Sequence, residues 1–359
     1  MENVVNHINS PNKKFWKNKK VFLTGHTGFK GSWLYLWLKL LNANVNGYSN
    51  NYSNYPSLFK YINGTKKNNG VGENINNYKN LKLKLDLFQP EIIFHFAAQP
   101  LVLKSYASPL STHRTNILGT ANLLEASKNL KNLKVICIVT SDKCYLNTSD
   151  KTFFKEDDKL GGSDPYSASK ACAEILTKSY YDSFYKALNI SVFSVRAGNV
   201  IGGGDWSKDR LIPDCIKGYY RNKKIEIRNP LSIRPWQFVL DPLNGYLRLA
   251  ENAYKSKNII YDGWNLGPMN KNHKSVEWIL NELSKHFENF NKFISINPNV
   301  NNLESTYLQL TSNKIKKQIN WNTKLSLKQS IEWTANWYKG YYSGKVNLCQ
   351  NQIRKFEKI

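Results

Sequence analysis

The sequence predicts an α/β fold, in which a doubly wound parallel sheet is followed by a smaller mixed C-terminal lobe. Three observations lead to this prediction. Short apolar strands alternate with amphipathic helices over most of the first 200 residues, glycines punctuate the first turn from strand to helix, and the alternation weakens after about residue 200. We therefore expect a nucleotide-binding domain over 15–200, a second lobe over 201–345 that is interleaved with it, and polar tails at 1–14 and 346–359.

The composition excludes several classes of protein. The chain has 359 residues, and its 41% hydrophobic and 13% aromatic content is that of a globular protein rather than a disordered coil. The first 18 residues lack an apolar signal segment, and no apolar run approaches the length of a membrane span. We therefore expect a cytoplasmic protein with no membrane partner.

The charge and the cysteines exclude two further kinds of site. The net charge of +25 would suit nucleic-acid binding, but the lysines are scattered among asparagines rather than gathered on one helix face, so we expect no nucleic-acid partner. The five cysteines are widely spaced and have no histidine pattern near them. Reduced thiols and no metal are expected.

The first strand, turn and helix predict a nucleotide site. The apolar strand at 21–23 runs into a turn and then into a helix at 29–41. Gly25 permits the tight turn, Gly28 lets a pyrophosphate approach bare backbone, and Gly31 lets the helix lie close to the strand. This GxxGxxG spacing is weak evidence by itself, because many such turns contain glycines for structural reasons alone.

The next segment leaves the choice of dinucleotide open. A second strand is expected at 44–48, a loop at 49–72, and the end of a third strand at Asn74 and Ile75. No carboxylate follows the second strand to hold a ribose, and no arginine follows it to hold a 2′-phosphate. The strand end therefore does not decide between NAD and NADP.

The remaining elements continue the alternation and then become irregular. The glycine-rich loop at 197–206 is expected to lie outside the core. The expected helices are 78–88, 109–128, one that begins after Asp164, 275–287, 311–318 and 327–338, and the expected strands are 92–97, 134–140 and 191–196.

Two short patterns identify candidate catalytic residues. Ser141–Lys143 follows a central strand, and polar residues at the carboxyl ends of parallel strands lie over the ligand crevice. Tyr166 and Lys170 are four residues apart, so they share one helix face. Each pattern alone has an ordinary explanation, a turn or cap in the first case and chance in the second. Their combination with the glycine turn predicts a catalytic site.

Seven motifs together resemble the extended short-chain dehydrogenase/reductase family, the NAD-dependent epimerases and dehydratases. GHTGFKG and SDKCY are similar to the branch of that family that dehydrates CDP-glucose. The resemblance implies a Rossmann-like NAD-binding domain, a substrate-binding lobe, NAD as cofactor, CDP-glucose as substrate, and a homodimer or higher homo-oligomer built on the helices at 109–128 and 166–186. The motifs are TGHTGFKGSW (24–33), HFAAQPLV (95–102), TSDKCY (140–145), PYSASK (165–170), RAGNVIGGGDW (196–206), DRLIPD (209–214) and RPWQ (234–237).

The resemblance also implies which residues touch cofactor and substrate. One position departs from the family, since Asn74 stands where an aspartate is usual, and an amide can bond a base edge without carrying charge. The implied cofactor contacts are Gly25, His26, Thr27, Gly28, Phe29, Lys30, Gly31, Asn74, Ile75, Phe96, Ala97, Ala98, Gln99, Tyr166 and Lys170. The implied substrate contacts are Ser105, Asn199, Trp206, Arg210, Leu211 and Arg234.

The implied reaction converts CDP-D-glucose to CDP-4-dehydro-6-deoxy-D-glucose, a precursor of deoxysugars in O-antigen-type polysaccharides. Tyr166 would take the O4 proton, with Lys170 favouring its phenolate and Ser141 bonding the same oxygen. Asp142 would protonate the departing C6 hydroxyl, and hydride would return from the cofactor to C6. Lys143 would either remove the C5 proton or stay charged and stabilise the enolate at O4.

Three alternatives remain. Another nucleotide-sugar 4,6-dehydratase would differ only in the base that it accepts. A 4-epimerase would need Tyr166, Lys170 and NAD, but not the acid and base pair at 142–143. A cofactor-sensing or nucleic-acid-binding module would need none of these groups, so the complete set of Ser141, Tyr166 and Lys170 disfavours it.

Overall fold

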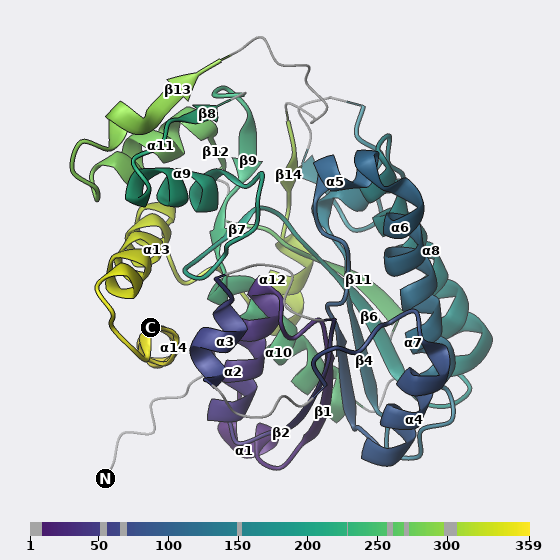
Figure 1. Cartoon of the computed structure of the whole chain (residues 1–359). Coiled ribbons are helices and arrows are strands. Elements are labelled where there is room, and N and C mark those ends of the chain that lie inside the picture. Colours follow the sequence, from purple (N-terminus) through teal and green to yellow (C-terminus); the bar gives the residue numbers. More distant parts are fainter. Residues whose placement is uncertain are drawn as a thin grey trace.

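The computed structural model describes residues 9–50, 56–64, 70–148, 153–227, 229–256, 261–268, 273–297 and 307–359. Figure 1 shows a central sheet with helices on both faces and a smaller lobe, built around α9 (Leu211–Tyr220) and α11 (Val276–Ser284), at one end of that sheet. The predicted α/β class and mixed C-terminal lobe are confirmed. No helix in the described part of the chain is long and apolar enough to cross a membrane.

The central sheet has six parallel strands in the order β11-β6-β4-β3-β1-β2. From β1 the chain winds outward to β2, and it then returns to the other side of β1 to build the remaining strands. The strand order therefore reverses between β1 and β3, where such sheets bind ligands. The strands are β1 (Lys20–Thr24), β2 (Asn44–Tyr48), β3 (Ile92–His95), β4 (Val135–Val139), β6 (Ser191–Ala197) and β11 (Tyr261–Leu266).

Register across the sheet explains its two apolar faces. Leu23, Phe94, Cys137 and Phe193 lie opposite one another on four neighbouring strands and belong to one buried cluster. The residues that precede them, beginning with Phe22, are also in register and belong to the other cluster. Since successive side chains of a strand point to opposite faces, continuous apolar strands can bury both sides of the sheet.

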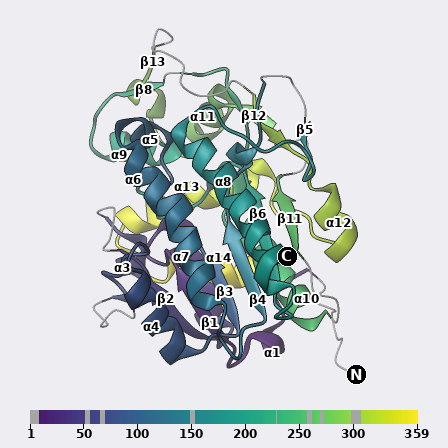
Figure 2. The ribbon, with the colours of Figure 1, turned by 90° about the vertical axis from the view of Figure 1, so that its right-hand side faces the viewer.

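Each face is covered by its own helices. Figure 2 views the molecule from the side on which α7 and α8 lie across the strands. This face is packed with α4 (Tyr78–Phe88), α7 (Gly119–Ser127) and α8 (Pro165–Tyr180). The opposite face is packed with α1 (Lys13–Trp16), α2 (Phe29–Leu40), α3 (Leu58–Asn63), α10 (Leu240–Lys255), α13 (Leu327–Tyr342) and α14 (Leu348–Glu357).

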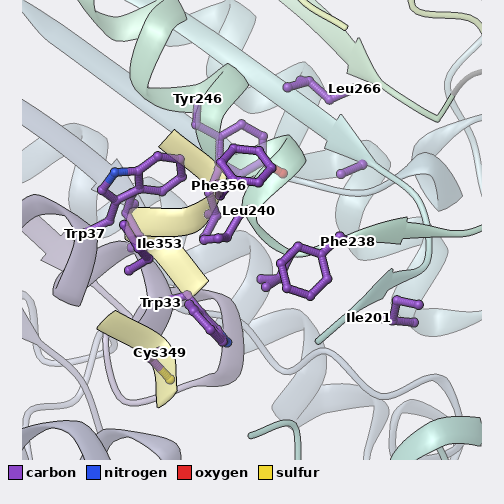
Figure 3. Packing of buried hydrophobic residues seen from close by; sticks show 14 of the residues in the cluster. Trp33, Trp37, Ile201, Phe238, Leu240, Tyr246, Leu266, Cys349, Ile353 and Phe356 are labelled. Carbon is purple, nitrogen blue, oxygen red and sulfur yellow. The ribbon is translucent and has the colours of Figure 1, made fainter. Parts of the chain in front are cut away.

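The C-terminal segment differs from the polar tail expected at 346–359. Residues 348–357 form α14, and Ile353 and Phe356 are fully buried against α2 (Figure 3). The indole nitrogen of Trp37 donates a hydrogen bond to Oε1 of Glu357 at 2.7 Å, and its ring meets Phe356 edge-on. The tail is helical because α2 provides an apolar partner for one of its faces. The N-terminal range 1–14 likewise includes the start of α1, and residues 1–8 lie outside the described part.

Two predictions between β2 and α4 were wrong. The range 49–72 contains the helix α3 as well as loop, with 51–55 and 65–69 outside the described residues. No strand ends at Asn74 and Ile75, because the described chain forms only a single bridge there, between Ser49 and Val71. Glycines at 70 and 72 adopt positive φ values of 78° and 90°, which interrupt an extended backbone on both sides of that bridge.

The helix expected at 109–128 is continuous over 109–127 but contains a π-helical turn. It comprises α6 (Pro109–His113), a π-helical turn at Arg114–Leu118, and α7. A short helix that was not predicted, α5 (Val102–Ala107), precedes it. Such π turns open the regular hydrogen-bond ladder within an otherwise continuous helix.

The loop at 197–206 was expected to lie outside the core, but this prediction was wrong, because residues 201–206 are all buried. A Cβ atom at Gly203 would lie 1.9 Å from the ring of Trp337, so this glycine makes room for a tryptophan. Trp33 also donates a hydrogen bond to the Gly203 carbonyl oxygen at 3.0 Å. The glycines serve close packing rather than solvent exposure.

The small lobe is held together by short strand pairs. β9 (Ile233–Pro235) pairs antiparallel with β12 (His273–Ser275), and β8 (Ile225–Ile227) pairs parallel with β13 (Ile294–Ile296). Further pairs connect it with the sheet domain, so the two expected ranges are interleaved. These are β7 (Val200–Ile201) with β10 (Gln237–Phe238), and β5 (Phe153–Phe154) with β14 (Gln309–Leu310), which leads to α12 (Asn313–Ile319).

Candidate active site

The three glycines of the first turn serve different needs. Gly25 has a φ of +72°, and a Cβ there would lie 2.6 Å from the backbone of Phe96 and Ala97. A Cβ at Gly31 would lie 2.1 Å from the Gly25 carbonyl oxygen. At Gly28, by contrast, a Cβ would meet only that oxygen, at 3.4 Å, so no protein atom requires a glycine. Its bare backbone fits a group from outside the chain.

The position of Gly28 fits an anionic group. Gly28 is the N-cap of α2, and no side chain caps this helix end. Free N–H groups at a helix start favour an anion such as a pyrophosphate. At the neighbouring end of β2, the hydroxyls of Thr27 and Ser49 lie 2.7 Å apart. These groups have the chemistry to hold a dinucleotide.

His26 faces the protein instead of the crevice. Its ring is buried, lies edge-on to Phe59 at 4.8 Å, and fills the space where a Cβ at Gly47 would come within 2.5 Å. Burial lowers the pKa of His26 to about 4, so the ring is neutral at physiological pH. Only the backbone of His26 is available to a ligand.

A cavity of about 350 Å³ opens between the carboxyl ends of the central strands and the small lobe. This volume is within the range of small-molecule sites. The predicted residues that line it are Lys30, Phe96, Ala98, Ser141, Asp142, Lys143, Tyr166, Lys170, Asn199, Arg210, Leu211 and Arg234. The structure thus brings together all five candidate catalytic residues.

The turn after β4 holds a buried carboxyl group. Ser141 donates a hydrogen bond to Oδ1 of Asp142 at 2.9 Å and accepts one from the backbone N–H of Lys143 at 3.3 Å. Oδ2 of Asp142 has no hydrogen-bond partner among the described residues. Burial raises the pKa of Asp142, although Lys143 and Ser141 oppose this effect. The site therefore contains a carboxyl group that holds its proton more tightly than usual.

The helix α8 carries the tyrosine and the lysine. Asp164 caps this helix by accepting from the backbone N–H of Ser167 at 2.9 Å. Burial raises the pKa of Tyr166 to about 12, although a hydrogen bond with Ser141 and the positive charge of Arg210 oppose this effect. The Nζ of Lys170 donates a hydrogen bond to the Val139 carbonyl oxygen at 3.1 Å. Deprotonation of the phenol thus depends on Ser141 and nearby cations.

Two lysines in the cavity have lowered pKa values. Burial lowers the pKa of Lys170 to about 8, although Glu174 raises it. Burial lowers the pKa of Lys30 to about 7, and the neighbouring cations Arg210 and Lys170 add to this effect. Arg210 itself forms an ion pair with Asp205 at 2.9 Å. The cavity is therefore rich in cationic groups, which suits an anionic ligand.

Several predicted contacts do not line the cavity. Ser105 is fully buried, donates to the Val102 carbonyl oxygen at 2.6 Å and accepts from the backbone N–H of Tyr166 at 3.2 Å. Trp206 packs at 5.2 Å from Tyr338 in an aromatic cluster. Both residues are buried and are not among the residues that line the cavity, so their contact with substrate stays a prediction.

Three of the predicted cofactor contacts, Asn74, Ile75 and Gln99, have partners within the protein. The side chain of Asn74 accepts from the backbone N–H of Asn76 at 3.0 Å, whereas Ile75 is buried against Gly119. The amide of Gln99 is engaged by Leu101 at 2.7 Å and 3.0 Å, and by Thr112. Gln99 thus shapes the loop after β3 and does not reach into the cavity.

The small lobe contributes lining residues that the sequence did not identify. Trp236 and Asp214 were inside recognised motifs, but nothing in those motifs showed that they face a ligand. Asp205 also lines the cavity and was missed because its ion pair with Arg210 depends on the folded loop. Further lining residues of this lobe include Ile212, Pro213, Ile225, Glu226, Ile227, Asn229, Ser232 and Val276.

Comparison with known proteins places the chain in a family. The model of the GDP-mannose 4,6 dehydratase family matches residues 22–334. The CDP-glucose 4,6-dehydratase of Salmonella typhimurium is 41% identical over 342 residues, which cover 94% of this chain and 95% of that protein. A UDP-glucuronate 4-epimerase of Thermodesulfobacterium geofontis is 28% identical and covers 88% of this chain and 95% of its own length.

Solved structures share the fold. A dTDP-glucose 4,6-dehydratase from Bacillus anthracis in complex with NAD superposes with a TM-score of 0.75 at 21% identity, covering 91% of this chain and 98% of that one. A UDP-glucuronic acid 4-epimerase from Bacillus cereus has a TM-score of 0.75 at 21% identity, covering 90% and 100%. The relationship predicted from the motifs is confirmed: the chain belongs to the GDP-mannose 4,6 dehydratase family.

Proposed function

We propose that the protein is an NAD-dependent CDP-glucose 4,6-dehydratase, a hydro-lyase that forms CDP-4-dehydro-6-deoxy-D-glucose. The observation that carries the proposal is the convergence of Ser141, Asp142, Lys143, Tyr166 and Lys170 on one cavity beside the glycine turn. The relative that is 41% identical over nearly its whole length bears this name. An elimination needs an acid and a base beyond the groups that oxidise C4, and positions 142 and 143 supply candidates for both.

The cofactor half of the site supports NAD. When bound, NAD would accept a hydride from the sugar and later return it. The uncapped start of α2 and the bare backbone of Gly28 suit its pyrophosphate, and Thr27 and Ser49 offer hydroxyls near the end of β2. Ser49 and Asn50 follow that strand, so no cation stands there for a 2′-phosphate. The strand end alone leaves the choice of dinucleotide open, and the related structures in complex with NAD support NAD.

Oxidation at C4 is assigned to Tyr166 as base. The phenol loses its proton with difficulty because it is buried, so its partners decide when it can act. Ser141 would bond the same sugar oxygen, and the cations Lys170 and Arg210 would stabilise the phenolate. Tyr166 then takes the O4 proton as the C4 hydrogen leaves as hydride.

Loss of water is assigned to the turn after β4. The 4-ketone makes the C5 proton acidic, and Lys143 would either remove this proton or stabilise the enolate. Asp142 would protonate the leaving C6 hydroxyl, for which its raised pKa is suited. Its Oδ2 is buried and has no hydrogen-bond partner among the described residues, so this oxygen is the candidate to carry the proton.

The diphosphate and sugar are assigned to the wall formed by the small lobe. Arg234 lies on β9, and its planar guanidinium suits phosphate oxygens. Arg210 is the N-cap residue of α9 and lines the same cavity. Asn199 lines the cavity with a side-chain amide, and its backbone carbonyl oxygen accepts a hydrogen bond from the backbone N–H of Gln237 at 3.0 Å. These residues would set the sugar over Tyr166.

Incubation with nucleotide sugars tests the proposal. Purified protein with NAD is offered CDP-, dTDP-, UDP- and GDP-glucose, and products are identified by mass spectrometry and NMR. We expect a 4-keto-6-deoxy product from CDP-glucose, with one water lost and no net consumption of NAD. A product of unchanged mass with inverted C4 would indicate a 4-epimerase, whereas no product from any sugar would favour a non-enzymatic role.

The proposal extends to assembly and location. Exposed apolar residues lie along α6 to α8, where Leu110, Leu118 and Ile175 are 80%, 56% and 58% exposed. Such a face suits pairing with a second copy. We propose a cytoplasmic homodimer that serves deoxysugar and lipopolysaccharide synthesis. Sedimentation that shows only monomer at micromolar concentration would contradict the dimer.

A further inference from the structure

Glu174 is a fully buried carboxylate of α8 that has no part in the proposed chemistry. It stands four residues after Lys170 and eight after Tyr166, so the three side chains lie along one side of the helix. It is not among the residues that line the cavity. A buried charge is costly unless it is paired, so its partners indicate what it does.

Four hydrogen bonds hold this carboxylate. Arg196 of β6 donates through Nε to one oxygen and through Nη2 to the other, each at 2.9 Å. Ser194 of the same strand donates at 2.5 Å, and Thr140 donates to Oε1. Burial opposes ionisation, but Arg196 and these hydroxyls hold the pKa of Glu174 below its ordinary value. The carboxylate is therefore ionised and joins α8 to the ends of β4 and β6.

The bond from Thr140 reaches the catalytic turn. Thr140 immediately precedes Ser141, and Val139 before it accepts the hydrogen bond from Lys170 at 3.1 Å. Two consecutive residues at the end of β4 are thus attached to α8 at points one helical turn apart. These attachments fix how Ser141 faces Tyr166.

Arg196 is itself fixed from the other side. Its Nη1 donates to the hydroxyl of Tyr145 at 2.7 Å and to the Glu156 carbonyl oxygen at 2.8 Å. A Cβ at Gly263 would lie 2.5 Å from Nη2, so that glycine makes room for the guanidinium. The ion pair is therefore built into the sheet and cannot reorganise freely.

We propose that Glu174 is a positioning residue for oxidation at C4, which fixes α8 against the end of β4 and keeps Lys170 protonated. The inference rests on the proposed function. Glu174 and the buried thiol of Cys144 raise the pKa of Lys170. Lys170 in turn lowers the pKa values of Lys30 and His95. Of these, Glu174 is held ionised, and it opposes the burial that lowers the pKa of Lys170.

Titration of Lys170 without substrate tests the electrostatic role. The rate at which acetic anhydride acetylates its Nζ is measured against pH, with the labelled peptide quantified by mass spectrometry. The wild-type protein should show a half-maximal rate near pH 8. Glu174→Gln should move this midpoint down by about one pH unit, because an opposite charge is lost. An unchanged midpoint in Glu174→Gln would overturn the electrostatic role.

Ser127→Ala is the matched control for Glu174→Gln. It also removes a buried hydrogen bond, between Ser127 and Tyr185 at 2.8 Å, but on α7. It should leave the Lys170 midpoint where it is in the wild-type protein. A shift in this control equal to that in Glu174→Gln would mean that the titration reports general loosening, and this too would overturn the proposal.

Thr140→Val tests the positioning role and is available even if Glu174→Gln does not fold. It keeps both charges of the ion pair and removes one hydroxyl. We expect an unchanged Lys170 midpoint, unchanged NAD affinity and a roughly tenfold slower appearance of reduced cofactor with CDP-glucose. A wild-type rate would overturn the positioning role. Since the lysine titration needs no substrate, an inactive wild-type protein would contradict the proposed function alone.

Discussion

The hydroxyl of Ser141 donates a hydrogen bond to Oδ1 of Asp142 at 2.9 Å. The other carboxyl oxygen, Oδ2, has no hydrogen-bond partner among the described residues. The same hydroxyl is a partner of the Tyr166 phenol. One serine therefore stands between the candidate base for oxidation and the candidate acid for elimination. Variants of these residues should separate the two steps.

Tyr166→Phe should abolish oxidation at C4. The phenyl ring keeps the packing but cannot accept a proton, so the formation of reduced nicotinamide should fall by roughly 10²- to 10⁴-fold. Stopped-flow absorbance with CDP-glucose measures this rate, and NAD binding serves as the control for an intact cofactor site. Normal turnover in this variant would exclude Tyr166 as the base.

Asp142→Asn should leave the first oxidation largely intact and slow the loss of water. An amide can still accept the hydrogen bond from Ser141, but it cannot deliver a proton to the C6 hydroxyl. Reduced cofactor should accumulate on rapid mixing and decay slowly. If no reduced cofactor forms in this variant, the division of roles between Asp142 and Tyr166 is wrong.

Lys143→Ala should stop the reaction at the 4-ketohexose with the cofactor reduced. Incubation in deuterated water then distinguishes the two roles of Lys143. If Lys143 is the base, exchange of the C5 hydrogen with solvent should cease in the variant. Exchange near the wild-type rate with elimination still blocked would assign Lys143 an electrostatic role instead.

Gly28→Ala should weaken NAD binding while changing stability little. A methyl group fits at this position beside the protein, but it would occupy the space of the pyrophosphate. Gly31→Ala is the contrasting variant, because its Cβ would lie 2.1 Å from a backbone oxygen and should lower the melting temperature. Quenching of tryptophan fluorescence by NAD and thermal unfolding measure the two effects. Equal NAD affinity in Gly28→Ala and the wild type would contradict the placement.

Asp241→Asn should change how stability depends on pH. Burial raises the pKa of Asp241 from 3.8 to about 7, although its Oδ1 accepts from the backbone N–H of Lys324 at 2.6 Å. Its contribution to stability is fully present below the unfolded-state pKa and is lost as pH rises through about 7. This difference is roughly 4 kcal/mol at most.

Urea unfolding at pH 5 and pH 8 measures the effect of Asp241. The wild-type protein should lose more stability between these values than Asp241→Asn, whose amide does not titrate. Parallel losses in the two proteins would show that Asp241 does not titrate in this range.

The sequence predicted those parts of the fold and site that depend on local signals. The turn at Gly25 and the helix that begins after Asp164 have short-range markers, and both were placed correctly. The orientation of a side chain within a motif has no such marker. Ser105 and Trp206 are in or near recognised motifs, yet they face the protein because distant elements, α8 and α13, contact them.

The C-terminal helix shows the same limit. Its apolar residues Cys349, Ile353 and Phe356 are spaced for one helix face, but the segment between them is polar and charged. Whether that face is buried depends on Trp37, more than 300 residues earlier in the chain. Arg210 is a second case, since its influence on Tyr166 appears only once the lobe has folded over the sheet.

The packing of α14 on α2 bears on how the protein is made. During synthesis, the apolar flank of the first nucleotide-binding helix stays open to water and chaperones until residues 348–357 have left the ribosome. The sixth strand, β11, also arrives late, at residues 261–266. A fragment that ends near residue 200 would lack both. The sheet domain therefore completes its fold only after residue 357 has been translated.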